Sequence, residues 1–359
     1  MKNFKLIAFL SILLILVLGA ALFYYAKGSA QSYHFASSQP ANIQAKPEVA
    51  EDSSKQTQPN QVTIIAVGDI MLSRSVAAQI KAHDIYYPFV AIKNYLHTAD
   101  IVFANLENPI TPGPVVPSGS MVFHANPGVE LALKDAGFTI LNLANNHTPN
   151  YGAKGVEDTL KALDSVGIEH IGAGVDLAAA DQPLYVQKNG IKFALLGYND
   201  QDVVPQSYGA APNHPGTNIM SLDKVSRDVK LARQNADIVI VSMHSGIEYQ
   251  PNPDQHQIDF AHAAIDAGAD LVIGHHPHVI ETVEKYKGKY IFYSLGNFVF
   301  DQAFSKDVQE GMTLKLSFNK NGLTDVQYNP VWIENLCQPN LVTDPTLAAE
   351  ELNKLGPDR

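Results

Sequence analysis

The amino-acid sequence predicts an α/β fold in which many of the strands pair in parallel. Short apolar runs of strand length alternate along the chain with amphipathic stretches of helix length, which is the order expected of successive βα units. Several of these runs are apolar almost throughout, as expected for strands in a sheet that is covered on both faces. Polar residues follow directly where the runs end, so the ends of the predicted strands are the place to look for function.

The predicted elements are spread evenly over most of the chain. The expected strands are residues 62–67, 101–104, 139–143, 193–196, 238–241, 271–273 and 290–293. The expected helices are residues 74–82, 127–136, 155–166, 222–234 and 255–267. Residues 312–318 and 324–332 alternate like antiparallel strands joined by a turn at 319–322, which predicts a mixed sheet or two packed sheets. Residues 199–220 are rich in Pro, Gly, Asn and Gln and are expected to form a long loop at the rim of a site.

The N-terminal region predicts a membrane anchor. Residues 6–26 carry no charge, and a helix of that length spans about 31 Å, close to the thickness of a bilayer. Lys2 and Lys5 precede this run, which places the N-terminus in the cytoplasm and the rest of the chain outside it. The alternative is a secretory signal cleaved near residues 28–30, which would release the domain from the membrane. The apolar run is long for a signal core, so the uncleaved single-pass anchor is favoured.

The remainder divides by composition. Residues 1–27 form the cytoplasmic stub and anchor, 28–61 a flexible linker rich in Ser, Gln, Ala and Pro, 62–335 the main domain and 336–359 a C-terminal tail. Cys337 is the single cysteine, so packing must stabilise the domain without an internal disulfide. The formal net charge is −11, and the first 30 residues contribute only lysines to it. A basic surface for nucleic acid is therefore not expected.

Four predicted strands end in residues that suit a metal centre. Asp69 follows the strand at 62–67, Glu107 that at 101–104, Asn146 and His147 that at 139–143, and His244 that at 238–241. Each has an ordinary structural alternative: a helix cap for the aspartate, a solvated loop acid for the glutamate, an Asn-rich turn, and a lone structural histidine. As a group, these residues favour a functional site, because they share the edge of the sheet where the carboxyl ends of parallel strands meet.

Residues 275–278 give the most specific local signal, with three histidines in four positions. In an extended segment, side chains two residues apart point the same way, so His276 and His278 are expected to converge on one centre. Imidazole combined with carboxylate and amide groups suits Zn, Mn or Fe. The sequence therefore predicts a site for one or two divalent ions.

Taken together, these segments resemble the CapA family of poly-γ-glutamate capsule synthesis proteins, whose fold is related to that of the calcineurin-like metallophosphoesterases. The resemblance extends from about residue 62 to about residue 301. It rests on Gly68-Asp69-Ile70-Met71, Asn105-Leu106-Glu107, Ala144-Asn145-Asn146-His147, His244-Ser245-Gly246-Ile247-Glu248-Tyr249, Gly274-His275-His276-Pro277-His278 and Ser294-Leu295-Gly296-Asn297-Phe298. It implies a four-layer α-β-β-α sandwich with a two-metal site at the strand ends.

The resemblance also implies roles for the site residues. Asp69 and His278 would bind the first metal, Glu107 would bridge the two, and Asn146, His244 and His276 would bind the second. His147, beside Asn146, would be the acid that protonates a leaving oxygen. The other motif residues are expected to bind substrate or to support the ligands; they are Asn145, Glu248, Tyr249, His275 and Asn297. Two such ions would activate a bridging water for attack at phosphorus.

Three departures from the pattern bear on the chemistry. Met71 stands where phosphoesterases carry a ligating histidine, so the first metal loses a ligand. The bridging acid is Glu107 rather than an aspartate. Asn150 stands where the CapA pattern often has an aspartate, and an amide cannot supply the charge that would raise the basicity of His147.

Three functions remain open from the sequence. The first is a metal-dependent, hydrolase-like component of poly-γ-glutamate or related surface-polymer assembly. The second is a non-catalytic subunit that binds the anionic polymer or a membrane synthase and export complex. The third is an extracytoplasmic phosphoesterase. All three place the N-terminal helix in the lipid bilayer, or the domain outside the cell after cleavage.

Overall fold

The computed structural model describes residues 60–203 and 205–359. The predicted anchor at 6–26 and nearly all of the predicted linker at 28–61 lie outside the described residues. Within the described part of the chain, no helix is both long enough and apolar enough to cross a membrane.

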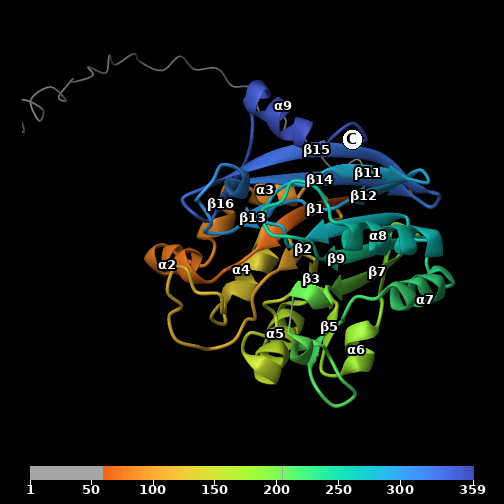
Figure 1. Ribbon diagram of the computed structural model, residues 1–359. Coiled ribbons are helices and arrows are strands. Elements are labelled where there is room, and N and C mark those ends of the chain that lie inside the picture. The colour runs from red at the N-terminus through yellow and green to blue at the C-terminus, as the bar shows by residue number, and fades with distance from the viewer. Residues whose placement is uncertain (1–59, 204) are drawn as a thin grey trace, which may run out of the picture. The chain divides into compact units, whose positions relative to one another are not determined.

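Two β-sheets form the centre of the domain (Figure 1). The larger runs in the order β16-β15-β14-β1-β2-β3-β4, and β13 pairs with β1 on the side. Its strands are β1 (Val62–Ile70), β2 (Ile101–Leu106), β3 (Ile140–Asn142), β4 (Glu169–Ile171), β13 (Asn297–Val299), β14 (Glu310–Asn319), β15 (Gly322–Glu334) and β16 (Gln338–Leu341). From β1 to β4 the neighbours are parallel, whereas β14 to β16 extend the sheet antiparallel.

The second sheet runs in the order β11-β12-β10-β9-β7-β6. Its strands are β6 (Leu184–Lys188), β7 (Ile191–Asn199), β9 (Ile238–His244), β10 (Leu271–His275), β11 (Val283–Tyr286) and β12 (Lys289–Phe292). The four central strands are parallel, and the two edge strands are antiparallel to their neighbours. The strands β5 (Ala173–Gly174) and β8 (Gly216–Thr217) form a separate small pair.

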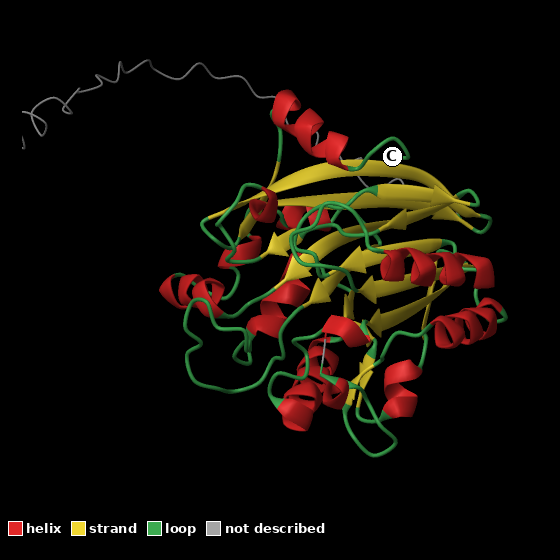
Figure 2. Cartoon of the chain, in the orientation of Figure 1, coloured by secondary structure: helices red, strands yellow, loops and turns green. Residues whose placement is uncertain are grey.

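Helices cover the outer faces of both sheets (Figure 2). Those packed on the larger sheet are α2 (Arg74–Ala82), η2 (Tyr87–Phe89), α3 (Lys93–Leu96), α4 (Val129–Ala136) and α5 (Gly152–Val166). Those packed on the second sheet are α7 (Leu222–Arg233) and α8 (Gln255–Ala267). The remaining helical segments are α6 (Leu177–Asp181), η3 (Gln201–Val203), η4 (Gln206–Tyr208), η5 (Asp307–Gln309) and α9 (Pro345–Lys354).

Successive side chains of a strand point to opposite faces of the sheet, and this alternation explains the layering. In β1, Ile64 points into the core between the two sheets, while its neighbour Ile65 points to the core beneath the helices. In the second sheet, Phe193 faces the other sheet and Ala194 faces α7 and α8. Each central strand therefore buries both faces, as its nearly continuous apolar sequence predicts. The layers follow the order helix, sheet, sheet, helix.

The predicted α/β class is confirmed, and the predicted strands and helices coincide with observed elements to within a few residues. The antiparallel pair predicted at 312–318 and 324–332 is the β14–β15 hairpin. The C-terminal residues join the same domain: β16 pairs with β15, and Leu355 is buried in the core between the sheets. The strands β4, β5, β6, β8, β11, β13 and β16 and the helices α3, α6 and α9 were not predicted from the sequence.

Gly68 allows two backbone segments to meet beside the end of β1. A Cβ atom at this position would lie 2.0 Å from the carbonyl oxygen of Gly296. The backbone N–H of the next residue, Asp69, donates to that same oxygen at 3.0 Å. The close approach positions Asp69 against the segment that leads into β13.

We expect Gly68→Ala to lower the free energy of unfolding by about 2 kcal/mol or more, because neither backbone can move away from the added methyl without breaking this pairing. Chemical denaturation measures the effect. Gly119→Ala is the control: its φ is +81° with no atom close to the new Cβ, so it should cost only about 1 kcal/mol for the left-handed backbone. Equal losses in the two variants would contradict the steric explanation.

Candidate metal centre

Two rows of polar residues meet where the two sheets end. In the larger sheet, Asp69 is paired in register with Asn105 on one side and Asn297 on the other, and Asn105 is paired with Asn142. In the second sheet, His244 is paired with Asn199 and His275. All of these side chains are buried. Desolvated polar groups are costly unless they are satisfied, so the two rows define a site rather than a packing contact.

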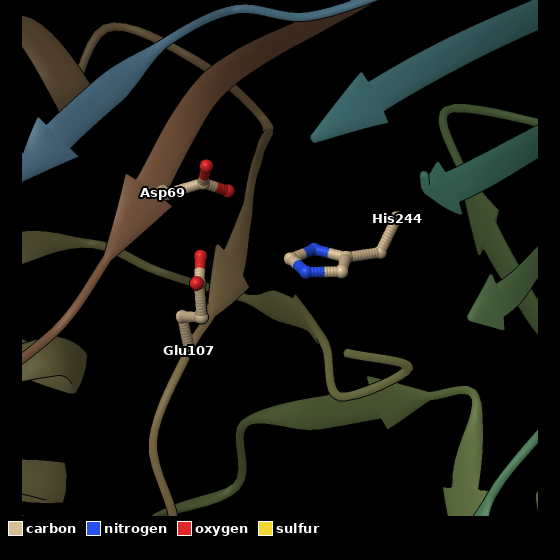
Figure 3. A group of neighbouring side chains, drawn as sticks. All are labelled: Asp69, Glu107 and His244. Atoms are coloured by element: carbon tan, nitrogen blue, oxygen red, sulfur yellow. The ribbon is translucent and has the colours of Figure 1, made fainter. Parts of the chain in front are cut away.

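Asp69, Glu107 and His244 form the centre of this site. Each offers a ligand atom within 4.8 Å of the other two, and each is fully buried. Figure 3 shows the two carboxylates, from the ends of β1 and β2, and the imidazole from β9 pointing toward one another across the gap between the sheets. Three residues far apart in sequence therefore converge on a single point, as the shared sheet edge predicts.

Asn105 links these three residues, and sequence reasoning missed its role. Its Nδ2 atom lies 2.8 Å from Asp69 Oδ1, 3.3 Å from Glu107 Oε2 and 3.3 Å from His244 Nδ1. Its Oδ1 accepts hydrogen bonds from Asn142 and Asn145 at 3.0 and 3.1 Å. A single amide in an otherwise apolar strand was the available signal, because such a group must find several partners when it is buried.

The histidines of residues 275–278 reach the site through an unusual backbone. His276 and His278 have φ values of 104° and 60°, so the chain turns through left-handed conformations and is not extended as the sequence argument assumed. His278 Nε2 lies 3.6 Å from Glu107 Oε1, and its Nδ1 lies 3.4 Å from Asp69 Oδ2. The His276 ring is 4.8 Å from that of His244, and its buried Nδ1 has no hydrogen-bond partner.

His275 also lies in the site, closer than the supporting role expected for it. It ends β10, and its Nδ1 is 3.3 Å from Asp69 Oδ1. Both of its ring nitrogens are buried without a hydrogen-bond partner. His275 and His278 therefore contact the carboxylates directly, whereas the ring of His276 lies beside His244.

Asn146 and His147 complete the site from the turn after β3. Asn146 Oδ1 lies 3.0 Å from His244 Nε2, and His147 Nε2 lies 3.9 Å from Glu107 Oε1. Asn150 Oδ1 accepts the backbone N–H of Phe123 at 2.7 Å, so the same oxygen must also accept from His147 Nδ1 at 2.9 Å. This bond fixes the tautomer and leaves the lone pair on Nε2 directed into the site.

The residues expected to support the ligands divide into two groups. Asn145 holds the turn, since its Oδ1 accepts the backbone N–H groups of His147 and Thr148. Asn297 Oδ1 contacts His278 Nδ1 at 3.0 Å and orients that ring. Tyr249 and Glu248 lie at the rim: the tyrosine hydroxyl accepts from Gln302, which in turn accepts from Asn297, both within 3.1 Å. Glu248 is half-buried and acts on the site through its charge.

Met71 takes no part in the site. Its side chain is fully buried in the core beneath the helices, and its sulfur accepts the backbone N–H of Ser73 at 3.0 Å. The position that the phosphoesterase pattern gives to a ligating histidine is therefore used for packing.

A smaller group of possible ligands lies next to the backbone of His244, at the start of the 199–220 loop. Asp200, Asp202 and His256 place ligand atoms within 4.8 Å of one another. Asp200 is satisfied by hydrogen bonds from Ser245 and His256, and its backbone N–H donates to the carbonyl of His244. These hydrogen bonds give Asp200 a structural role, which is to hold the end of β9 in place.

Burial sets the protonation of the histidines. It lowers the pKa of His147 to about 3, even though the hydrogen bond to Asn150 acts in the opposite direction. Burial and then the neighbouring His278 lower the pKa of His276 to about 3, and burial likewise holds the pKa of His244 well below its ordinary value. Neutral imidazoles are the form that binds metal ions.

The pKa values of the two carboxyl groups are shifted in opposite directions. Burial would raise the pKa of Asp69, but its contacts with His275 and His278 hold that pKa well below the ordinary value. Burial raises the pKa of Glu107 well above its ordinary value, and the charges of Asp69 and Glu248 raise it further. The two neighbouring acids are therefore shifted in opposite directions, so Glu107 takes up a proton at a higher pH than Asp69 does, which is the usual outcome for close carboxylates.

The donor set fits a divalent ion. Glu107 Oε1 and His276 Nδ1 are buried without hydrogen-bond partners, which is costly in a site built only of protein atoms. Two carboxylates, an amide oxygen and several neutral imidazoles are ligands that Zn, Mn and Fe share, so the side chains do not select among them.

The family follows from comparison with known proteins. Residues 63–302 match the model of the family described as bacterial capsule synthesis protein PGA_cap. The chain belongs to this family. The matched range contains every residue of the centre, so the site described above lies entirely within the PGA_cap region, and the family predicted from the sequence motifs is confirmed.

Two curated relatives carry related names. The capsule biosynthesis protein CapA of Bacillus anthracis is 35% identical over 78% of this chain and 69% of its own length. The PGA biosynthesis protein CapA of Bacillus subtilis is 36% identical over 74% of this chain and 70% of its own length. Among solved structures, the calcineurin-like phosphoesterase YfkN from Bacillus subtilis matches with a TM-score of 0.48 and 14% identity, over 82% of this chain and 96% of that chain.

We expect Asn105→Ala to weaken metal binding about 10- to 100-fold, because the amide orients both carboxylates and His244 without being a ligand itself. Competition with a chromogenic chelator measures the affinity, and chemical denaturation verifies that the variant is folded. Asn329→Ala, in β15, removes a strand asparagine whose amide bonds Tyr95 instead, and should leave the affinity unchanged. A folded Asn105 variant with the parent's affinity would rule out this role.

Metal uptake should release a proton from Glu107 wherever the pH lies below the raised pKa of that carboxyl, because the side chain binds an ion only as the carboxylate. The apparent affinity should accordingly fall as the pH is lowered. Calorimetric titration in two buffers of different ionisation enthalpy detects the proton. Glu107→Gln should abolish the difference between buffers, and identical heats for the parent protein would disprove the assignment.

Proposed function

We propose that this chain is a metal-dependent, hydrolase-like protein that acts on poly-γ-glutamate, or a related anionic surface polymer, during its synthesis or export. We further propose that the N-terminal apolar segment tethers the domain to the outer face of the cytoplasmic membrane. Membership of the PGA_cap family and the names of the two CapA relatives support the polymer as the substrate class. The uncharged run at 6–26 and the lysines before it support the tether.

One observation carries the hydrolase-like part of the proposal. Glu107 Oε1 is buried without a hydrogen bond, 3.6 Å from His278 Nε2 and 3.9 Å from His147 Nε2. The other oxygen of this carboxylate accepts from the Asn105 amide, whereas Oε1 faces Nε2 of the two histidines across distances too long for a hydrogen bond. A cation bound between these atoms would fill that space.

Asp69, Glu107, Asn146, His244, His276 and His278 would hold the ion or ions, with His275 as a further donor. A bound divalent ion would supply a water of lowered pKa and positive charge to attract an anionic substrate. The protein's own charge is −11, so this positive charge would be needed near a polyanion.

His147 is the residue that moves a proton. Its Nδ1 hydrogen is committed to Asn150, and its neutral state leaves Nε2 as an acceptor in the site. It can therefore take a proton from an attacking water. Donation to a leaving group requires that Nε2 accept a proton first, so the acid role implied by the family pattern is the second half of its cycle.

The test is the metal content of the purified full chain together with its turnover of a chromogenic phosphodiester and of a γ-linked glutamate oligomer. His278→Ala should lose metal and turnover together. His147→Ala should keep the metal and lose turnover at least about 100-fold, the usual contribution of a general acid–base group.

His97→Ala is the control, since this exposed histidine contacts only the α4 backbone through its side-chain hydrogen bond. Stoichiometric metal without turnover of either substrate would refute the hydrolase and favour the polymer-binding role. A chain that binds no divalent ion would refute the metal centre.

A further inference from the structure

A groove of about 360 Å³ lies beside the metal centre, a volume typical of sites for small ligands. One wall is a single face of α2 with the residue before it, formed by Ser73, Ala77, Ala78 and Lys81. The loop at 114–116 and the segment at 124–129 supply the facing residues. None of the metal-centre residues lines it, so the groove is a separate feature.

The groove and the metal centre share a wall. The guanidinium carbon of Arg74, which lines the groove, lies 4.6 Å from the centroid of the Phe123 ring. The same ring stacks on His147 at 3.9 Å between centroids. Arg74 also follows Asp69 by only five residues. A chain lying in the groove therefore runs close to the reacting end of the site.

The walls are fixed in place by hydrogen bonds. The two ring nitrogens of His124 lie 3.0 Å from the carbonyl of Thr111 and 2.6 Å from that of Pro114. The backbone N–H of His124 donates to Ser73 Oγ at 3.2 Å, which joins this segment to the start of α2. Arg74 donates to the carbonyl of Ser120 at 3.0 Å, which pins the far end of the loop. The groove is therefore formed before any ligand arrives.

The groove carries one cation that no neighbouring acid of the described chain balances. Arg74 and Lys81 line it, and none of its lining residues, all in the described part of the chain, is Asp or Glu. Arg74 is about nine-tenths buried and paired with Asp301, and its Nε has no hydrogen-bond partner. Lys81 forms no ion pair with any described residue and leaves its charge available at the open end. The rest of the lining is largely apolar.

We propose that this groove binds a segment of an anionic γ-glutamyl chain and leads it to the metal centre. A carboxylate of the segment lies near Lys81, and the two-carbon spacers of the γ-linked backbone lie against the apolar wall. This combination of carboxylate and methylene groups matches the exposed lysine and the apolar side chains of the groove. The inference rests on the proposed function for its substrate class and assigns that substrate a place.

The test is the affinity of the full chain for a fluorescent γ-linked glutamate decamer, measured by anisotropy with a chelator present so that binding at the metal centre is removed. Lys81→Glu should weaken binding about three- to tenfold, the effect of reversing one exposed charge. Ala78→Trp should weaken it as well, because the indole fills an exposed part of the groove. A γ-linked isoglutamine decamer, in which each α-carboxylate is an uncharged amide, should bind more weakly than the glutamate decamer.

Lys230→Glu is the matched control, since Lys230 also lies in the last turn of an exposed helix, α7, but away from the groove. Equal affinity in the parent, Lys81→Glu and Ala78→Trp would overturn the groove, as would equal binding of the neutral decamer or no binding by the parent. The metal content and turnover of the parent are measured separately. Failure of the groove and failure of the metal centre are thus distinguishable.

Discussion

The fold depends on one constraint: the parallel strands of two packed sheets end at the same edge, so each sheet presents its terminal polar residues to the other. Asp69, Asn105 and Asn142 lie on neighbouring strands of one sheet, and Asn199, His244 and His275 on neighbouring strands of the second. The apolar core between the sheets extends up to these two rows. Water is thereby excluded, and the polar groups must satisfy one another or a ligand.

Exclusion of water decides the chemistry of the site. In water, the two acids would be ionised and the histidines would titrate near neutral pH. Buried together, His147, His244 and His276 have lowered pKa values, the imidazole neighbours of Asp69 lower its pKa, and the pKa of Glu107 is raised. The site thus combines an ionised Asp69 with imidazole lone pairs, which is an environment that favours a cation over a neutral ligand.

The sequence predicted the parts of this site that depend on local pattern. Asp69, Glu107 and His244 were found because each follows an apolar run and because strand ends share an edge. Asn105 was not found, since its importance comes from its register with Asp69, and register between strands is not a local property. The left-handed turns at His276 and His278 were also not predictable, because neither residue type requires a positive φ.

The same distinction applies to the fold. The central strands bury both faces and could be recognised by composition alone, whereas β11 and β16 lie at sheet edges with mixed exposure. Helix α9 was missed because what holds it is tertiary: Leu355, just after the helix, is buried between the sheets, and Lys354 pairs with the buried Glu310. The N-terminal anchor, inferred from length and charge, stays a prediction.

The hydrogen bonds of Asn105 bear on the order in which the chain would fold and bind metal. They join Asp69, Glu107 and His244 using protein atoms alone, so the ligands are held in position by the backbone and one amide. Under the proposed function, folding and metal binding would then be separable steps. A chain built in this way would fold first and take up an ion afterwards, and it would exchange that ion without losing its architecture.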